Sequence, residues 1–263
     1  MNVRLTERDR RLLAKCAVCR WLTTDQLKRL CFPEATLNAV QKRLRKLAEA
    51  GYLRSYQEHP TAESVHAVGP KDRCLVEEKG IAVMAASEVS RQMEHLLGIN
   101  EVRIAVETAD VQVAYYFAYW ELFDLGWRET VVPDAIFALQ ATERRTFIVE
   151  YDRGTVTLRT LSGKLRRYAE GLNGFLFEAV LVVTEERRRL DLLAGEMRRE
   201  GLTVPVLVAK LDGVREAGLF EAWFVELPGG TRRKVLNAAA GSPFGVSSRE
   251  ERWNEASHDF SGD

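Results

Sequence analysis

The sequence lacks several features that would assign a protein to a functional class directly. Its 38 Lys and Arg balance its 38 Asp and Glu over 263 residues, so the net charge identifies no partner. No uninterrupted apolar run approaches the ~20 residues that a membrane-spanning helix requires. The charged N-terminus has no apolar segment of the kind found in a secretory signal peptide. We therefore expect a soluble, cytoplasmic protein with no membrane partner.

Cysteine is scarce, and four residues in a chain of this length do not indicate a disulfide scaffold. Cys16 and Cys19 form a C-x-x-C motif that Cys31 and either His66 or Cys74 could complete as a metal site. However, the motif lies within an amphipathic helical pattern, and neither a second C-x-x-C nor an H-x-H follows. Core packing of these thiols is therefore the favoured interpretation. The sequence also has no internal repeat and no phosphate-binding glycine loop.

The charge that is present is unevenly distributed. Between Met1 and Arg54, thirteen Lys and Arg accompany five Asp and Glu, an excess of eight positive charges. A basic segment of this size attracts a polyanion. The N-terminal fifth of the chain is thus the first candidate for DNA binding.

Three helices followed by two strands are expected in the same region. Thr6 is the predicted N-cap of the first helix, and Thr23 or Thr24 that of the second, which Pro33 ends. A third helix is expected over Glu34–Ala50, ending at Gly51. The strands are expected at Leu53–Gln57 and Ser64–Val68. This order predicts a winged helix-turn-helix domain over residues 1–85.

In such a domain the third helix enters the major groove of double-stranded DNA. Its polar face supplies base and phosphate contacts, for which Asn and Gln suit adenine and Arg suits guanine. The predicted DNA-binding residues are Asn38, Gln41, Lys42 and Arg45, with Arg43, Lys46 and Arg54 at the flanks. The alternatives are a solvated basic helix face and a winged helix that contacts protein.

The rest of the chain predicts an α/β domain over residues 86–228 with a mixed central sheet. Strand-like runs alternate with helical ones, a pattern typical of α/β layers. A helix is expected to continue to Glu107, and the aromatic run Val113–Glu121 is interpreted as a buried helix. Later strands are expected at Glu178–Thr184, Val204–Ala209 and Glu221–Leu227. Residues 229–263 are rich in Gly, Ser and charge, which predicts a disordered tail.

Acidic side chains accompany two neighbouring strand-like runs, Thr130–Leu139 and Arg145–Tyr151. Glu150 and Asp152 share one face of their strand, because side chains alternate with a period of two. If the strands pair, Asp134 lies beside them, and three carboxylates could then hold Mg²⁺. Lys164, on the helix that follows, would face a bound phosphate. The alternative is a structural network in which the carboxylates pair with nearby cations.

The ordered set LTERDRRLL, LTTDQL, RLRKLAEAGYL, HLLGIN, PDAIF, FIVEYDRGT and LSGKLRRY resembles the replication-relaxation family over about Leu5–Leu227. That family is associated with plasmids and other mobile elements and with plasmid replication and DNA relaxation. The resemblance implies a winged helix joined to a domain similar to the PD-(D/E)xK nucleases.

Pro133-Asp134 matches the first part of the nuclease motif, and Glu150 matches its second acid. Asp152 stands where the lysine of the motif is expected, and Lys164 could supply that cation from the next helix. Glu101 or Glu107 would be a further acidic member. The resemblance therefore implies Asp134, Glu150, Asp152 and Lys164 as the catalytic set, with the first three as metal ligands.

Three functions are compatible with these features. The favoured one is a DNA-binding protein of a plasmid or other mobile element whose nuclease-like domain has a non-cleaving or accessory role. The second is a Mg²⁺-dependent DNA endonuclease or nickase. The third is a winged-helix transcriptional regulator whose second domain serves oligomerisation or ligand sensing. Plasmid replication or mobilisation proteins, and a second copy of the chain in a homodimer, are the expected protein partners.

Overall fold

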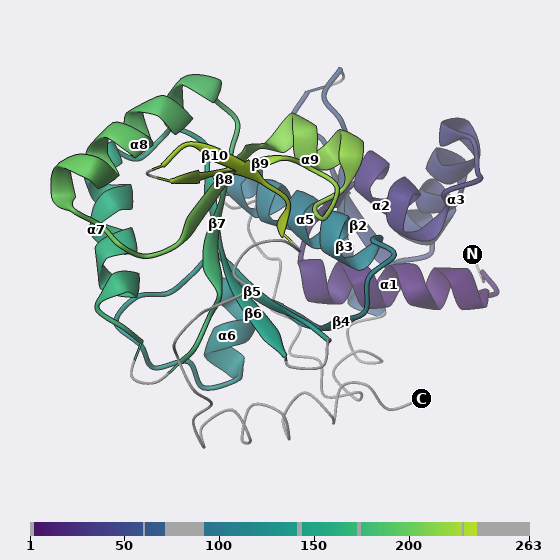
Figure 1. Cartoon of the computed structure of the whole chain (residues 1–263). Helices are drawn as coiled ribbons and strands as arrows, with labels where there is room; N and C mark the ends of the chain where they lie inside the picture. The colour runs from purple at the N-terminus through teal and green to yellow at the C-terminus, as the bar shows by residue number, and fades with distance from the viewer. Residues whose placement is uncertain are drawn as a thin grey trace. The chain divides into compact units, whose positions relative to one another are not determined.

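The computed structural model describes residues 3–59, 61–71, 92–140, 144–172, 175–227 and 229–235 (Figure 1). The chain forms two compact units, Met1–Ile104 and Ala105–Asp263, each of which is described below by itself. The units divide within a helix, whereas the sequence predicts a boundary at residues 85 and 86. Cys74 and residues 236–263 of the predicted tail lie outside the described residues.

The N-terminal unit begins with three helices, each started by a threonine. Thr6 caps α1 (Glu7–Cys19), Thr23 caps α2 (Thr24–Cys31) and Thr36 caps α3 (Leu37–Glu49). In each case the threonine hydroxyl accepts a hydrogen bond from a backbone N–H in the first turn, which satisfies a donor that has no partner inside the helix. The predicted caps at Thr6 and Thr23 are confirmed.

A small antiparallel sheet completes this unit. Its strands are β1 (Leu22–Thr23), β2 (Leu53–Tyr56) and β3 (Val65–Val68), in the order β1-β3-β2. Helix α5 (Met93–Glu107) contributes Ile104 to the unit's core, and Asn100 donates hydrogen bonds to the carbonyl oxygens of Cys19 and Trp21. Cys16, Cys19 and Cys31 are all buried, as core packing predicts.

The second unit is an α/β structure built on a seven-stranded mixed sheet, so the predicted fold class is confirmed. The strand order is β10-β9-β8-β7-β6-β5-β4. Strand β7 runs parallel to both of its neighbours, β6 and β8, and the other pairs are antiparallel. The strands are β4 (Val113–Ala118), β5 (Ala135–Leu139), β6 (Arg145–Asp152), β7 (Ala179–Thr184), β8 (Val206–Lys210), β9 (Phe224–Leu227) and β10 (Thr231–Arg233).

Two helices, α7 (Leu158–Ala169) and α8 (Arg187–Glu200), lie side by side against one face of this sheet (Figure 1). The short helices are α6 (Tyr119–Asp124) and α9 (Leu211–Ala217). Leu161, Leu165 and Met197 pack in one core cluster with Ile148 and Val182 of the strands. Because side chains alternate along a strand, Glu150 and Asp152 lie on the same helix-covered face as Ile148.

Two parts of this unit differ from the sequence prediction. The prediction of a helix over Val113–Glu121 is wrong for Val113–Ala118. These residues form the edge strand β4, which pairs with β5. Tyr115 and Phe117 occupy alternate positions and stack with ring centroids 5.1 Å apart, as residues on one face of a strand do. The sheet also extends past residue 228, where a tail was predicted, because β10 pairs with β9.

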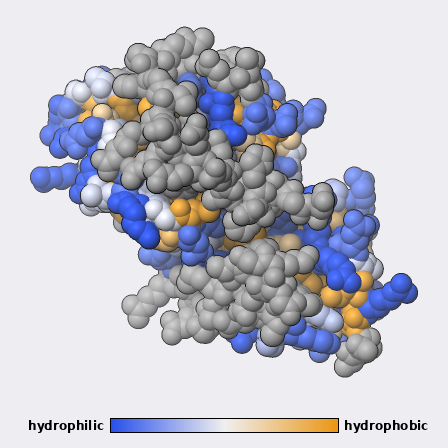
Figure 2. All heavy atoms as spheres, turned by 90° about the horizontal axis from the view of Figure 1, so that it is seen from below, coloured by the Kyte–Doolittle hydropathy of each residue, from blue (hydrophilic) through white to orange (hydrophobic). Residues whose placement is uncertain are grey.

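The face shown in Figure 2 is mostly hydrophilic where it is coloured, with scattered hydrophobic patches. Among the described residues, Trp223 is the most exposed large hydrophobic side chain, at 54%. No helix within these residues is both long and apolar enough to cross a membrane.

Candidate nucleic-acid interface and carboxylate cluster

Helix α3 separates a buried stripe from a polar face. Val40, Leu44 and Leu47 are at most 1% exposed and hold the helix against the N-terminal core. The opposite face carries six exposed polar side chains that form no hydrogen bond or ion pair with other described residues, namely the acid Glu49 in the last turn and five others. The five others are Asn38, Gln41, Lys42, Arg45 and Lys46. All five are predicted DNA contacts, and the structure places them on the solvent-facing side of one helix.

Arg43 is in a different position from its neighbours. Its Nε donates to Asp9 Oδ1 at 2.8 Å, one Nη donates to Asp9 Oδ2, and the same nitrogen reaches the carbonyl oxygen of Arg4 at 3.2 Å. Asp9 is only 1% exposed. Burial acts to raise the pKa of Asp9, yet hydrogen bonds from Arg43 and Thr6 hold that pKa below its ordinary value. Arg43 therefore links α3 to α1, whereas the sequence predicts it at the flank of the DNA contacts. Arg54, the third of the predicted flanking residues, is exposed on β2.

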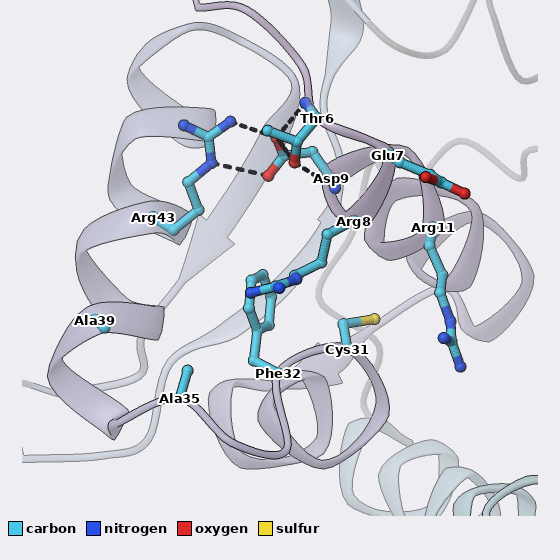
Figure 3. Close-up of a pocket in the computed structure, with 10 residues that line it drawn as sticks. All are labelled: Thr6, Glu7, Arg8, Asp9, Arg11, Cys31, Phe32, Ala35, Ala39 and Arg43. Atoms are coloured by element: carbon cyan, nitrogen blue, oxygen red, sulfur yellow. Dashed lines mark hydrogen bonds and ion pairs between the residues drawn. The ribbon is translucent and has the colours of Figure 1, made fainter.

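A groove of about 820 Å³ lies beside this ion pair, between the first turns of α1 and α3 (Figure 3). The Arg8 guanidinium lies over the Phe32 ring, 5.4 Å from its centroid, and Arg11 also lines the groove. Glu7 and Asp9 add carboxylates to the same walls. The groove thus has mixed charge, with Asp9 already neutralised by Arg43.

In the second unit, Asp134, Glu150 and Lys164 come together. Asp134 comes directly before β5, Glu150 lies in β6, and Lys164 lies on α7. Lys164 Nζ is 2.6 Å from Glu150 Oε2 and 3.9 Å from Asp134 Oδ1. The other oxygen of Glu150 accepts a hydrogen bond from the Tyr168 hydroxyl, one helical turn after Lys164. The Tyr151 backbone N–H donates to Asp134 Oδ2 at 2.7 Å.

Burial sets the protonation of this cluster. Glu150 is 3% exposed, and burial raises its pKa from 4.5 to about 7 although Lys164 acts to lower it. Burial acts to lower the pKa of Lys164, but the charges of Glu150 and Asp134 leave it above its ordinary value. Burial and then Glu150 raise the pKa of Tyr168 well above 10. Lys164 and Tyr168 thus remain protonated donors at neutral pH, where Glu150 titrates.

Asp152 does not join the cluster. Its two oxygens accept hydrogen bonds from Arg189 on α8, at 2.8 and 2.9 Å, and the Gly154 N–H donates to one of them at 3.0 Å. Arg189 also donates to the carbonyl oxygen of Val156. Asp152 and Glu150 share a strand face as predicted, but each pairs with a cation on a different helix.

The arrangement does not fit the hard-cation site that the sequence predicts. Mg²⁺ requires oxygen ligands at about 2.0–2.1 Å together with several waters. Both Glu150 oxygens already accept hydrogen bonds, one of them from Lys164, and Asp152 is sealed against Arg189. Within the described ranges, no three His, Cys, Asp or Glu side chains form a group that could hold a metal ion. A divalent cation would have to displace Lys164.

Of the two acids that the resemblance implies as a further member, Glu101 is engaged elsewhere. Glu101 accepts hydrogen bonds from Arg29 at 2.6 and 2.8 Å and from Gln26 at 2.8 Å, within the N-terminal unit. The roles of Tyr168 and Arg189 were not predicted from the sequence. The four-residue interval between Lys164 and Tyr168 was the available signal, since it places both on neighbouring turns of one helix. No comparable signal links Arg189 to Asp152.

Comparison with known proteins identifies one family. The family model described as replication-relaxation matches residues 13–177 of the chain. No curated protein and no solved structure matches it.

Proposed function

The chain belongs to the replication-relaxation family, and from this premise we propose that it binds double-stranded DNA of a plasmid or other mobile element through helix α3. Membership of the family suggests a role in replication and relaxation of such an element. The observation that carries the DNA-binding proposal is the polar face of α3. Five uncommitted polar side chains on one exposed helix face are available to phosphates and base edges.

The order of the elements supports this use of α3. A helix, a short strand, two more helices and a two-stranded hairpin follow one another, and the first strand joins the hairpin in an antiparallel sheet. We interpret this unit as a winged helix, in which α3 is the helix that enters the major groove. Arg8 and Arg11, in the groove beside the start of α3, add positive charge to the same region.

We also propose that the α/β unit does not hydrolyse DNA. Glu150, which matches the second acid of the nuclease motif, has both carboxylate oxygens engaged. Lys164 donates a hydrogen bond to one of them and Tyr168 to the other. No position is left for a metal ion and its water without breaking the Glu150–Lys164 ion pair. A non-cleaving, DNA-bound role is the consequence.

The binding test uses the full chain and a fluorescein-labelled 30-base-pair duplex in an anisotropy titration. We expect Lys42→Ala/Arg45→Ala to lower the affinity by about tenfold or more, since each base or phosphate contact contributes roughly 1–3 kcal/mol. The matched control is Arg187→Ala/Arg188→Ala, which removes the same charge from exposed positions on α8. Equal affinities of the α3 variant and the control would refute the role of α3.

The cleavage test uses supercoiled plasmid incubated with the protein and Mg²⁺, Mn²⁺ or EDTA. We expect the plasmid to shift in a gel and to remain supercoiled under all three conditions. Metal-dependent nicking that disappears in Asp134→Ala/Glu150→Ala would overturn the non-cleaving proposal and identify a nuclease.

A further inference from the structure

A second groove, of about 500 Å³, runs along helix α7 in the α/β unit. Its lining contains three cations, three threonines, a glycine and two valines, and no carboxylate. The residues are Thr130, Val131, Val132, Thr157, Arg159, Thr160, Gly163, Lys164 and Arg167. The groove beside α3, by contrast, includes two acids in its walls. The charge of the α7 groove is therefore complementary to an anion.

The sequence of α7 dictates which side chains line this groove. Leu161, Leu165 and Tyr168 form the buried stripe of the helix. Arg159, Gly163 and Arg167 recur every four residues and so share another face. Both arginines are exposed, and neither side chain forms a hydrogen bond or an ion pair with another described residue, although the charge of Arg159 acts on Glu196 of α8. These two positive charges are available to a ligand, whereas Lys164 is held by Glu150.

The spacing favours a chain of phosphates over a single anion. Eight residues separate the two arginines, which is about 12 Å along the axis at 1.5 Å per residue. One strand of duplex DNA presents a charge about every 3.4 Å of its axis, so this distance spans several phosphates. Gly163 lies between the two arginines, and a Cβ built there would meet no atom within 4 Å. A strand can approach the helix backbone at that point.

We propose that this groove binds the phosphodiester backbone of DNA, as a second contact in addition to α3. Arg159 and Arg167 donate hydrogen bonds to phosphate oxygens. The hydroxyls of Thr157 and Thr160 bond to each other at 2.8 Å, which leaves one hydroxyl hydrogen of that pair as a further donor. This inference rests on the proposed function only in taking DNA as the partner. It gives the α/β unit a binding role that requires neither a metal ion nor cleavage.

The experiment measures the dependence of DNA affinity on salt for the full chain. Each phosphate contact contributes about 0.9 to the slope of log K against log salt for duplex DNA. We expect Arg159→Gln/Arg167→Gln to reduce this slope by about 1.8 and to lower the affinity on the order of 50-fold at 0.1 M salt. Arg187→Gln/Arg188→Gln, with the same charge change on α8, should leave both quantities as in the wild type.

Gly163→Leu provides a second test that changes no charge. The side chain enters open space on a helix, where leucine is favoured over glycine, so the fold is retained. It fills the groove and should weaken DNA binding at least fivefold, as measured beside a circular dichroism spectrum that matches the wild type. Wild-type affinity in both groove variants would overturn the inference.

The two binding proposals fail in different ways. If the groove variants bind as the wild type does and Lys42→Ala/Arg45→Ala loses affinity, the second contact is refuted and α3 stands. If the α3 variant keeps its affinity and the groove variants lose theirs, the α7 groove is the main DNA site and the proposed function of α3 fails.

Discussion

Replacing Glu150 with glutamine tests the electrostatics of the carboxylate cluster directly. Glu150 lies on the helix-covered face of the sheet, and its oxygens accept hydrogen bonds from Lys164 and Tyr168. Burial raises its pKa from 4.5 to about 7. Glutamine has the shape of the protonated acid but does not titrate. The variant therefore removes one proton equilibrium while keeping the size of the side chain.

The magnitude and sign follow from the two pKa values. A pKa raised on folding contributes stability that is fully present below 4.5 and is lost as the pH rises through 7. A shift of this size corresponds to about 3 kcal/mol, at about 1.4 kcal/mol per pKa unit. His66 has the opposite effect, because burial lowers its pKa from 6.5 to about 4. Its contribution is present above pH 6.5 and is lost as the pH falls through 4.

Since these two contributions oppose each other between pH 4.5 and 6.5, the wild-type pH profile alone is not diagnostic. The informative quantity is the difference in unfolding free energy between wild type and Glu150→Gln, in which the His66 contribution cancels. Urea unfolding followed by tryptophan fluorescence reports on both units, since Trp120 and Trp127 are buried in the α/β unit and Trp21 in the N-terminal unit. We expect the difference to fall by about 3 kcal/mol from pH 4.5 to 7.5. A difference that stays constant within about 0.5 kcal/mol would refute a raised Glu150 pKa.

Two further substitutions test the N-terminal unit. Arg43→Ala leaves the buried Asp9 carboxylate without its cation and should lower the free energy of unfolding by about 3 kcal/mol. Arg45→Ala, on the exposed face, should change it by less than about 0.5 kcal/mol in the same urea titration, and equal effects would contradict the assignment of Arg43. At Gly69 a Cβ would lie 2.4 Å from the carbonyl oxygen of Gly51. Gly69→Ala should therefore destabilise by about 1–3 kcal/mol, and an unchanged thermal midpoint would show that the backbone relaxes at little cost.

Periodicity and capping residues were sufficient to predict most of the fold. The helices α1, α2 and α3 begin at threonine caps and carry buried stripes, both of which depend on local sequence. The run over Val113–Glu121 was predicted wrongly because several consecutive aromatic residues suit a buried helix or a strand equally well. Pairing with β5 decides the outcome, and that contact comes from a segment some twenty residues later in the chain.

The candidate site was predictable in its composition but not in its pairing. The spacing of side chains along β6 placed Glu150 and Asp152 on one face, and the resemblance singled out Asp134 and Lys164. Which cation reaches which carboxylate depends on how the helices pack on the sheet. Asp152 pairs with Arg189, 37 positions later, and this partner is one of many arginines on a highly charged helix. Sequence spacing alone does not distinguish among them.

The pairing also bears on what the α/β unit can do with DNA. A metal ion bound at Asp134 and Glu150 would have to hold Glu150 ionised and expel the Lys164 ammonium from between the two carboxylates. Both changes oppose the arrangement in the structure, where burial favours the protonated acid and the carboxylates raise the pKa of Lys164. Arg159 and Arg167 form no ion pair with another described residue, so a phosphate can approach them without breaking one. DNA is therefore expected to meet this unit through the arginines of α7 and not through its carboxylates.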